Sequence, residues 1–189
     1  MKKLLVISGH PKLEVSLANK TILNLIEEKI DNVKVRRLDS LYPGYQIDVE
    51  AEQHSLQSAD IIVLQFPLYW YSTPALLKKW LDDVFSYGFA YGADGDKLKN
   101  KNLILSFTTG GPEQSYDTLG YNHFPISELI KPLKQTAYLT QMILHPPIIS
   151  HNMAYVEGVR NTPAGIEKKA TEHSQSLISK LNEVMLLAG

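Results

Sequence analysis

Short runs of apolar residues recur along the chain at residues 4–7, 61–64, 103–107 and 148–150. Such short and nearly continuous runs are typical of strands buried on both faces of a sheet. A fifth run, at residues 33–38, mixes apolar with charged positions and is therefore expected to be more exposed. The pattern predicts five strands, with the strand at 33–38 at or near an edge of the sheet.

Between these runs, apolar residues recur every three or four positions, which is the spacing of one face of a helix. Three such faces consist of Ile22, Leu25, Ile26 and Ile30; of Leu76, Leu77, Trp80, Leu81, Val84 and Phe85; and of Ile166, Ala170, Leu177, Ile178, Leu181 and Met185. Two more helices are expected at residues 49–59 and 126–142. Pro132 should kink the second of these or mark its true start.

Polar residues and prolines mark the expected ends of these helices. Ser16, Asp48 and Thr73 each stand before an apolar periodic segment and can cap it through a side-chain oxygen. Pro74 suits a first helical turn, and Gly88 is expected to end the helix that Pro74 begins.

Strands alternate with helices throughout, which favours a parallel sheet covered on both faces. Five strands in this arrangement predict an α/β, flavodoxin-like, doubly wound sheet with the order 2-1-3-4-5. No internal repeat, low-complexity tract or linker divides the chain. We therefore expect one domain over residues 1–189.

Three loops should meet at the carboxyl edge of this sheet, at residues 10–19, 67–70 and 108–111. These loops follow the first, third and fourth strands. The first and third strands flank the point where the strand order reverses. The middle loop carries Tyr69, Trp70 and Tyr71. These rings can face a flat ligand, or they can pack against the next loop.

The first loop leads into a helix N-terminus, whose free amides favour an anion. Ser16 adds a hydroxyl, and His10 can add a donor or instead bond a loop carbonyl. No G-x-G-x-x-G or Walker sequence follows the first strand, so side chains and helix amides would hold a phosphate. In the third loop, Gly110 and Gly111 allow a ligand to approach the backbone, although an ordinary turn would also explain them.

Tyr116 and His123 lie in the next loop and are candidates for proton transfer or for stabilising a developing anion. Either can also be a surface or packing residue. His145 is interpreted as structural, and the role of His151 is left open. No histidine pair has the spacing of a zinc site, so no metal is expected.

Composition narrows the function classes further. The chain is 44% hydrophobic and 21% charged over 189 residues, which suits a soluble globular protein. A net charge of −1 without a basic stripe argues against nucleic acid, and a flavodoxin-type electron carrier would be more acidic. No cysteine is present, which excludes thiolate catalysis and iron–sulfur clusters. The first apolar run is too short for a signal peptide, so we expect a cytoplasmic protein.

Six segments together resemble the NAD(P)H:quinone oxidoreductase family of flavodoxin-like flavoproteins, which includes the ancillary oxidoreductases of bacterial glutathione-gated potassium-efflux systems. They are G-H-P with S-L-A-N within residues 9–19, L-Y-P-G-Y-Q-I-D at 41–48, F-P-L-Y-W-Y-S-T-P-A-L-L-K-K-W-L-D at 66–82, G-F-A-Y-G at 88–92, T-T-G-G at 108–111 and L-H-P-P-I at 144–148. The segment at 66–92 together with T-T-G-G is the most specific part.

The resemblance implies a site for FMN, with FAD as the alternative. The residues that it assigns to the flavin are His10, Ser16, Leu17, Ala18, Asn19, Pro67, Leu68, Tyr69, Trp70, Thr108, Thr109, Gly110 and Gly111. Tyr116 matches the family's active-site tyrosine. The family's histidine corresponds to Asn122, one residue before His123. FMN is favoured because the chain lacks the carboxyl-terminal extension of the longer relatives that use FAD.

The function implied is two-electron transfer from NAD(P)H to quinones or similar planar acceptors by a ping-pong mechanism. The alternative is a regulatory subunit of a potassium-efflux transporter with secondary redox activity, held peripherally at the inner face of the membrane. The resemblance also implies a homodimer. An aromatic cluster of Phe85, Tyr87, Phe89 and Tyr91 would be a costly exposed patch on a monomer.

Overall fold

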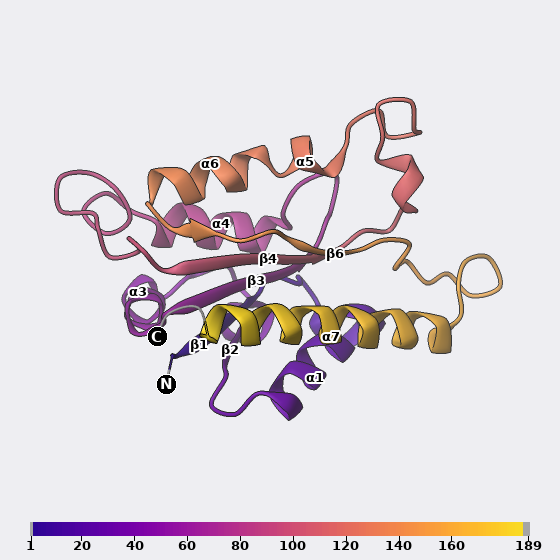
Figure 1. Ribbon diagram of the computed structural model, residues 1–189, viewed down its shortest axis with the longest axis horizontal. Coiled ribbons are helices and arrows are strands. Elements are labelled where there is room, and N and C mark those ends of the chain that lie inside the picture. The colour runs from indigo at the N-terminus through magenta and orange to yellow at the C-terminus, as the bar shows by residue number, and fades with distance from the viewer. Residues whose placement is uncertain (1, 187–189) are drawn as a thin grey trace.

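A computed structural model describes residues 2–186 of the chain and contains one parallel sheet (Figure 1). Its strands are β1 (Leu4–Ser8), β2 (Lys34–Arg37), β3 (Ile61–Pro67), β4 (Asn102–Thr108), β5 (Ile143–Leu144) and β6 (Ile148–Ser150). The order is β2-β1-β3-β4-β5, and β6 also pairs with β4. The predicted flavodoxin-like order is therefore confirmed.

The fifth position in the sheet is shared by two short strands rather than filled by one. Residues 143–144 pair with residues 102–103 of β4, and residues 148–150 pair with residues 106–108. Pro146 and Pro147 lie between the two strands and have no N–H to donate to the sheet. The predicted strand at 148–150 is β6, and β5 extends the same edge towards the amino end of β4.

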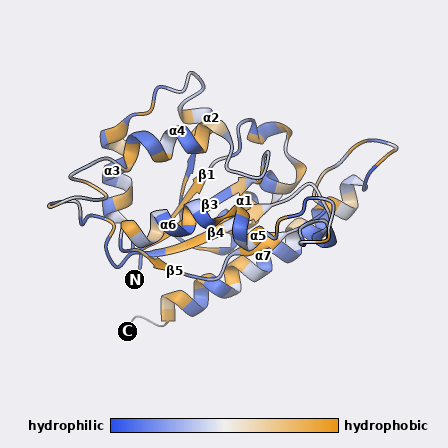
Figure 2. Ribbon diagram, turned by 90° about the horizontal axis from the view of Figure 1, so that it is seen from above, coloured by the Kyte–Doolittle hydropathy of each residue, from blue (hydrophilic) through white to orange (hydrophobic). Residues whose placement is uncertain are grey.

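Helices cover both faces of the sheet (Figure 1). One face packs against α1 (Leu17–Lys29) and the long α7 (Pro163–Leu186); the other packs against α2 (Leu38–Leu41), α3 (Val49–Ser58), α4 (Ala75–Val84), α5 (Ile126–Leu129) and α6 (Lys131–Leu139). Short 3₁₀ turns occupy Leu13–Val15 and Glu113–Ser115. Figure 2 shows apolar and polar residues alternating around most helices, as expected for helices with one buried face.

Two of the three predicted caps are confirmed. The Ser16 side chain accepts a hydrogen bond from the amide of Asn19, and Asp48 accepts one from the amide of Ala51. Thr73 is not a cap, because α4 starts one residue later and its N-cap position is Pro74.

Three predicted helix boundaries also need correction or refinement. The helix before Gly88 ends at Val84, and Gly88 lies in a following turn with φ of +79°. The helix expected at 126–142 is two helices, and Pro132 sits in the first turn of the second, as a proline there allows. Leu38, expected at the end of the second strand, begins α2 instead.

Side chains alternate between the two faces along each central strand. The face towards α3, α4 and α6 is here called the apolar face, and it receives residues such as Ile7, Phe66 and Phe107. The face towards α1 and α7 is called the mixed face, and it receives Val6, Val63 and Ile104. Both layers bury their apolar side chains almost completely. The carboxyl ends of the strands are therefore the place where a ligand can enter.

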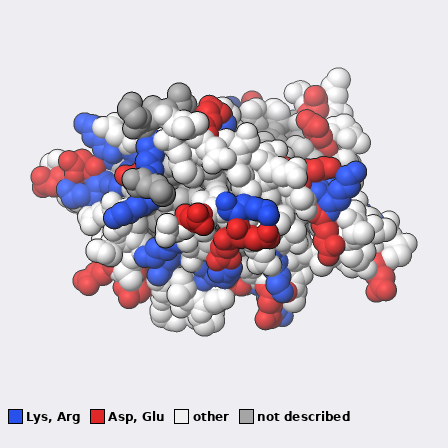
Figure 3. Space-filling model, turned by 60° about the horizontal axis from the view of Figure 1, so that its bottom comes forward, with Lys and Arg blue, Asp and Glu red and all other residues white. Residues whose placement is uncertain are grey.

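Charges on the surface are mixed rather than segregated. Figure 3 shows acidic and basic side chains interspersed on the face that it presents. No helix within residues 2–186 is long and apolar enough to cross a bilayer.

Candidate functional site

A cavity of about 330 Å³ lies at the carboxyl ends of β1, β3 and β4. It is lined by His10, Val15, Ser16, Leu17, Ala18, Asn19, Pro67, Leu68, Tyr69, Thr108, Thr109, Gly110, Met153, Ala154 and Tyr155. All three predicted loops therefore converge. Of the residues predicted to bind the flavin, Trp70 and Gly111 are the two that lie outside the lining.

The first wall of the cavity is the start of α1. Ser16 caps this helix, with its Oγ 3.1 Å from the amide nitrogen of Asn19. The first amides of an α-helix have no acceptor within the helix, and Leu17 and Ala18 bring theirs to the cavity. The hydroxyl proton of Ser16 remains available for an acceptor on a ligand. This arrangement suits an anionic group.

His10 lies beside this helix end and is buried. Its Nδ1 accepts a hydrogen bond from the amide of Lys12 at 3.0 Å, so the neutral ring carries its proton on Nε2. Burial lowers the pKa of His10 below its usual value, and the nearby Asp39 carboxylate acts in the opposite direction. The edge of the ring faces Tyr69, with centroids 6.2 Å apart. His10 thus offers a donor that an incoming anion would also help to protonate.

The aromatic loop forms a tight turn in which the ring of Trp70 is uncovered. Tyr69 and Ser72 exchange two backbone hydrogen bonds of 2.9 and 3.0 Å, and Trp70 and Tyr71 form the tip. Both tip residues have positive φ, +46° and +63°, which is strained for aromatic residues and is found most often at functional sites. Trp70 is 92% exposed. Trp70 therefore does not pack against the next loop, whereas the Tyr71 hydroxyl donates a hydrogen bond to Asn122 in that loop.

The third wall is a turn bonded to the chain that follows β6. The Thr109 hydroxyl donates to the carbonyl of Gly111 at 3.0 Å, and the same Oγ1 lies 3.0 Å from Nδ1 of His151. Amides of residues 152 and 153 donate to the carbonyls of Gly111 and Thr109. A Cβ at Gly111 would lie 3.2 Å from the Tyr116 ring, so any other residue would require the ring to shift slightly. The turn is held on both sides.

The two predicted catalytic residues lie outside the cavity lining and differ in their surroundings. Tyr116 is half-buried behind Gly111, and its ring centroid is 5.6 Å from that of His151. His123 is exposed on a loop with φ of +61°. Its neighbour Asn122 accepts a hydrogen bond from the Tyr71 hydroxyl at 3.3 Å.

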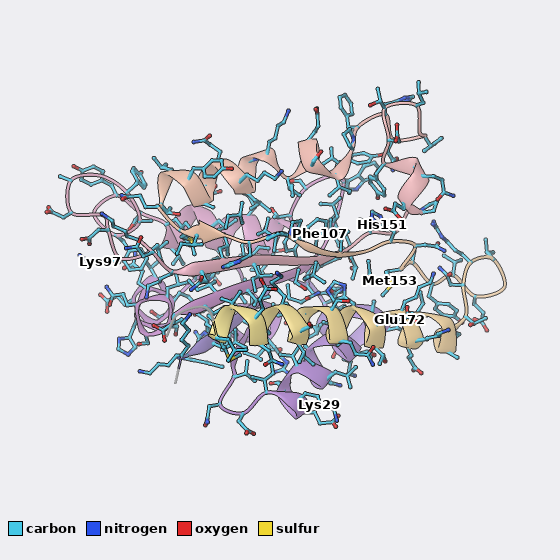
Figure 4. The ribbon with its side chains drawn as sticks, in the orientation of Figure 1. Lys29, Lys97, Phe107, His151, Met153 and Glu172 are labelled. Carbon is cyan, nitrogen blue, oxygen red and sulfur yellow. The ribbon has the colours of Figure 1, made fainter. Side chains whose placement is uncertain are left out.

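Sequence reasoning missed the segment after β6. Met153, Ala154 and Tyr155 line the cavity, and His151 bonds the turn at Thr109; Figure 4 shows His151 and Met153 beyond the ends of the strands. Because Thr109 Oγ1 donates its only proton to Gly111, Nδ1 of His151 donates to it. The signal was available, since this segment leaves the fifth strand at the same carboxyl edge as the other loops.

Another cavity of about 330 Å³ lies between α4 and α6, on the apolar face. Leu81, Phe85 and Leu133 are among its mainly apolar lining residues. Apart from Leu68, it shares no residue with the cavity at the strand ends. The convergence of polar groups and backbone amides makes the cavity at the strand ends the candidate functional site.

The sequence profile of the flavodoxin-like fold family matches residues 2–177. Among curated relatives, the uncharacterized NAD(P)H oxidoreductase YrkL of Bacillus subtilis is 43% identical over 162 residues, 85% of this chain and 92% of the relative. The glutathione-regulated potassium-efflux system ancillary protein KefF of Enterobacter sp. is 43% identical over 148 residues, 78% of this chain and 82% of the relative.

Solved structures give the same assignment. General stress protein 14 of Treponema denticola, in complex with FMN, superposes with a TM-score of 0.83 and 32% identity over 94% of this chain and 98% of that chain. An NADPH-quinone reductase from P. pentosaceus superposes with a TM-score of 0.76 and 32% identity over 93% of this chain and 97% of that chain. The resemblance drawn from the sequence motifs is confirmed, and the chain belongs to the flavodoxin-like fold family, with relatives that include NAD(P)H oxidoreductases and potassium-efflux ancillary proteins.

Proposed function

We propose that the protein is a flavin-dependent NAD(P)H oxidoreductase, with FMN as its flavin and quinones or similar planar molecules as acceptors. The observation that carries the proposal is the cavity at the strand ends, in which a capped helix N-terminus, a buried histidine and a glycine-containing turn converge. The FMN complex of the Treponema denticola relative supports the choice of FMN. FAD is the alternative cofactor.

The residues present fit the chemistry of FMN. Ser16, His10 and the first amides of α1 are donors suited to its phosphate. Gly110 brings the backbone of the turn at 108–111 to the cavity and can offer its amide to a polar ring edge, whereas the amide of Thr109 donates to the carbonyl of Ser150. Leu68 and Tyr69 supply an apolar wall. When bound, FMN supplies the two-electron redox chemistry that the side chains of this chain lack.

We propose a ping-pong scheme, in which one side of the bound flavin serves both reactants. The wall at residues 67–69 occupies one side of the cavity. NAD(P)H and the acceptor would then use the remaining side in turn. Steady-state rates at several quinone concentrations should give parallel double-reciprocal lines, and intersecting lines would contradict the shared side.

Tyr116 is proposed as a proton donor or acceptor beside the turn at Gly111. Tyr116→Phe should slow turnover by about 10²-fold or less while FMN stays bound. Tyr138→Phe is a matched control, because Tyr138 lies exposed on α6. His123 is a weaker candidate, since it is exposed on the loop after Tyr116.

The alternative function is regulation of a potassium-efflux transporter, favoured by the similarity to KefF. In that case the protein would be cytoplasmic and peripheral at the inner face of the membrane. Co-purification of the tagged protein with a transporter of this class from its own host would favour this role. Full oxidoreductase turnover without any such association would favour the enzyme.

A homodimer is proposed as well, although the aromatic cluster expected to drive it is smaller than predicted. Phe89 is buried and Phe85 is half-buried, which leaves Tyr87 and Tyr91 exposed. Apolar side chains on the loops at 70–71 and 119–124 are also exposed, among them Leu119 and Tyr121. Sedimentation of the active protein at micromolar concentration should give a dimer, and a fully active monomer would contradict it.

The decisive experiment is a titration of the purified protein with FMN. Fluorescence of the flavin should change on binding, and FAD measured in parallel decides between the two cofactors. Unchanged fluorescence and spectrum with both flavins would overturn the proposed function.

A further inference from the structure

A chain of buried polar side chains crosses the interior from α7 to the cavity. Its members, called here the buried polar chain, are in order Ser150, His173, Ser106, Gln65, Asn19 and Thr108. The five from His173 to Thr108 are each at most 3% exposed. The buried polar chain begins at β6, passes through α7, β4, β3 and α1, and ends on the last residue of β4.

Each link has hydrogen-bonding distance. Ser150 Oγ lies 2.8 Å from Nδ1 of His173, and Nε2 of His173 lies 2.7 Å from Ser106 Oγ. The Ser106 hydroxyl donates to Oε1 of Gln65 at 2.5 Å. Gln65 Nε2 then donates to Asn19 Oδ1 at 2.9 Å, and Asn19 Nδ2 donates to Thr108 Oγ1 at 3.2 Å.

With the amides of Gln65 and Asn19 oriented as they are in the structure, counting protons gives the direction of these bonds. The hydroxyl of Ser106 has one proton, and Gln65 Oε1 can only accept it. Nε2 of His173 must therefore donate to Ser106 Oγ. Burial lowers the pKa of His173 to about 4, so at pH 7 the ring is neutral and Nδ1 has no proton. Nδ1 then accepts the proton of Ser150, and every bond in the chain points the same way.

Two members of the buried polar chain, Asn19 and Thr108, line the cavity, and Thr108 is the last member. Thr108 lines the cavity, and its Oγ1 accepts from Asn19. Its own hydroxyl proton is therefore free to be donated to an acceptor in the cavity. Hydrogen bonds in a chain polarise one another, so the preceding bonds strengthen this donor.

The opposite direction would give Thr108 the opposite property. With the proton of His173 on Nδ1, Ser106 would donate to the ring, and the amides of Gln65 and Asn19 would turn over. Thr108 would then donate to Asn19 and present only lone pairs to the cavity. A phosphate or ring carbonyl oxygen, which can only accept, would lose one donor.

We propose that His173, which does not line the cavity, is a positioning residue for the ligand site, and that its Nε2–H form makes Thr108 a hydrogen-bond donor to an acceptor oxygen of the bound ligand. The inference rests on the proposed function only in taking that ligand to be FMN. The direction of the hydrogen bonds along the buried polar chain does not depend on a ligand.

The first test needs no ligand. Long-range ¹H–¹⁵N NMR spectra of the ¹⁵N-labelled protein at pH 7 distinguish the two neutral forms of histidine. The His173 signals can be assigned by their loss in His173→Gln. The Nε2–H form is expected, and the Nδ1–H form would overturn the proposal whether or not the protein binds FMN.

The second test measures the dissociation constant of FMN. His173→Leu removes the donor and should weaken binding by about 3- to 10-fold, the effect of one neutral hydrogen bond. His173→Gln keeps an N–H near the place of Nε2 and should stay within about twofold of the parent. Ser174→Ala is the matched control, because Ser174 is equally buried but bonds its own helix at Ala170.

A double-mutant cycle separates positioning from a general loss of structure. Thr108→Val removes the donor at the end of the chain while nearly keeping its shape. In that background, His173→Leu should cause no further loss of FMN affinity. An equal loss in both backgrounds would overturn the proposal. Should His173→Leu not fold, Ser106→Ala interrupts the chain at its next member and is expected to give the same result.

If the parent protein does not bind FMN, the proposed function fails, and the NMR measurement alone decides the direction of the chain.

Discussion

The two faces of the central sheet differ in the polarity of their side chains towards the carboxyl end of the strands. On the apolar face, alternate residues stay apolar to the end, finishing with Ile7, Phe66 and Phe107. On the mixed face the same strands turn polar: Val6 is followed by Ser8, Val63 by Gln65, and Ile104 by Ser106 and then Thr108. One sheet thus has a face that only packs and a face that packs at one end and forms hydrogen bonds at the other.

The comparison teaches how the site is kept rigid without many charges. Polar groups buried beneath the cavity, such as Gln65 and Asn19, are hydrogen-bonded to one another, as buried polar groups require. The apolar face can therefore provide stability while the polar end of the mixed face orients the site. Substitutions on the two faces should accordingly change different measurements.

The largest effect is expected on the apolar face. Phe107 is fully buried and stacks on Phe66 with ring centroids 5.3 Å apart. Phe107→Ala should lower the free energy of unfolding by about 3–5 kcal/mol, because it leaves a cavity in a packed core. Urea denaturation measures this loss. A change below about 1 kcal/mol would contradict tight packing of the apolar face at Phe107.

The next effect is a pH dependence that belongs to the mixed face. The folded-state pKa of His173 is about 4, below the value of 6.5 expected when unfolded. The neutral ring therefore stabilises the fold fully above pH 6.5, and this contribution is lost as the pH falls to about 4. The loss amounts to about 3 kcal/mol.

Comparison with His173→Gln isolates this contribution from that of the carboxylates. The stability of the variant, measured by denaturation between pH 7 and pH 4, should fall less steeply by about the same 3 kcal/mol. Parallel curves for parent and variant would contradict a depressed pKa at His173.

A smaller effect is expected for His10, which is buried at the cavity end of the sheet. His10→Ala should weaken FMN binding by about 1.5–3 kcal/mol, because a donor to the phosphate is lost. His145→Ala is the control, since His145 bonds Asn102 at the amino end of β4 with 2.9 Å between Nε2 and Oδ1. Fluorescence titration with FMN measures the affinity of both variants. Equal FMN affinities for His10→Ala and His145→Ala would remove His10 from the proposed site.

The smallest effect concerns Ser8, whose buried Oγ has no hydrogen-bond partner within residues 2–186. Removing an unpartnered hydroxyl takes away a group that gains nothing from burial. Ser8→Ala should therefore leave the melting temperature unchanged or raise it slightly. The free energy of unfolding should change by no more than about 0.5 kcal/mol. Marked destabilisation on thermal unfolding would mean that the Ser8 hydroxyl is hydrogen-bonded like the other polar groups of the mixed face.

The strand pattern and the converging loops were predictable from the sequence because each depends on local rules. Uninterrupted apolar runs identified the central strands, and Ser16 and Asp48 were recognised as caps from their residue type. Thr73 failed as a cap because Pro74, with no side-chain acceptor, took the N-cap position instead. A local rule cannot decide between neighbouring residues when the backbone path is set by packing.

The buried polar chain was not predictable, although its members interrupt apolar runs visibly. Gln65 and Ser106 stand inside strands in which every neighbour is apolar. Their partners come from up to 67 residues away in the sequence, as for Ser106 and His173. The uncovered tip at Trp70 depended in the same way on a turn whose backbone bonds the sequence does not reveal.

The two prolines between β5 and β6 also bear on how this molecule behaves in a concentrated solution. The fifth position is the last in the sheet, so its outer side is an open edge that a strand from another molecule could extend. The edge strands are only two and three residues long, and Pro146 and Pro147 place two residues without N–H groups between them. An incoming strand would find no continuous row of donors and acceptors, and the edge therefore resists the growth of intermolecular β-aggregates.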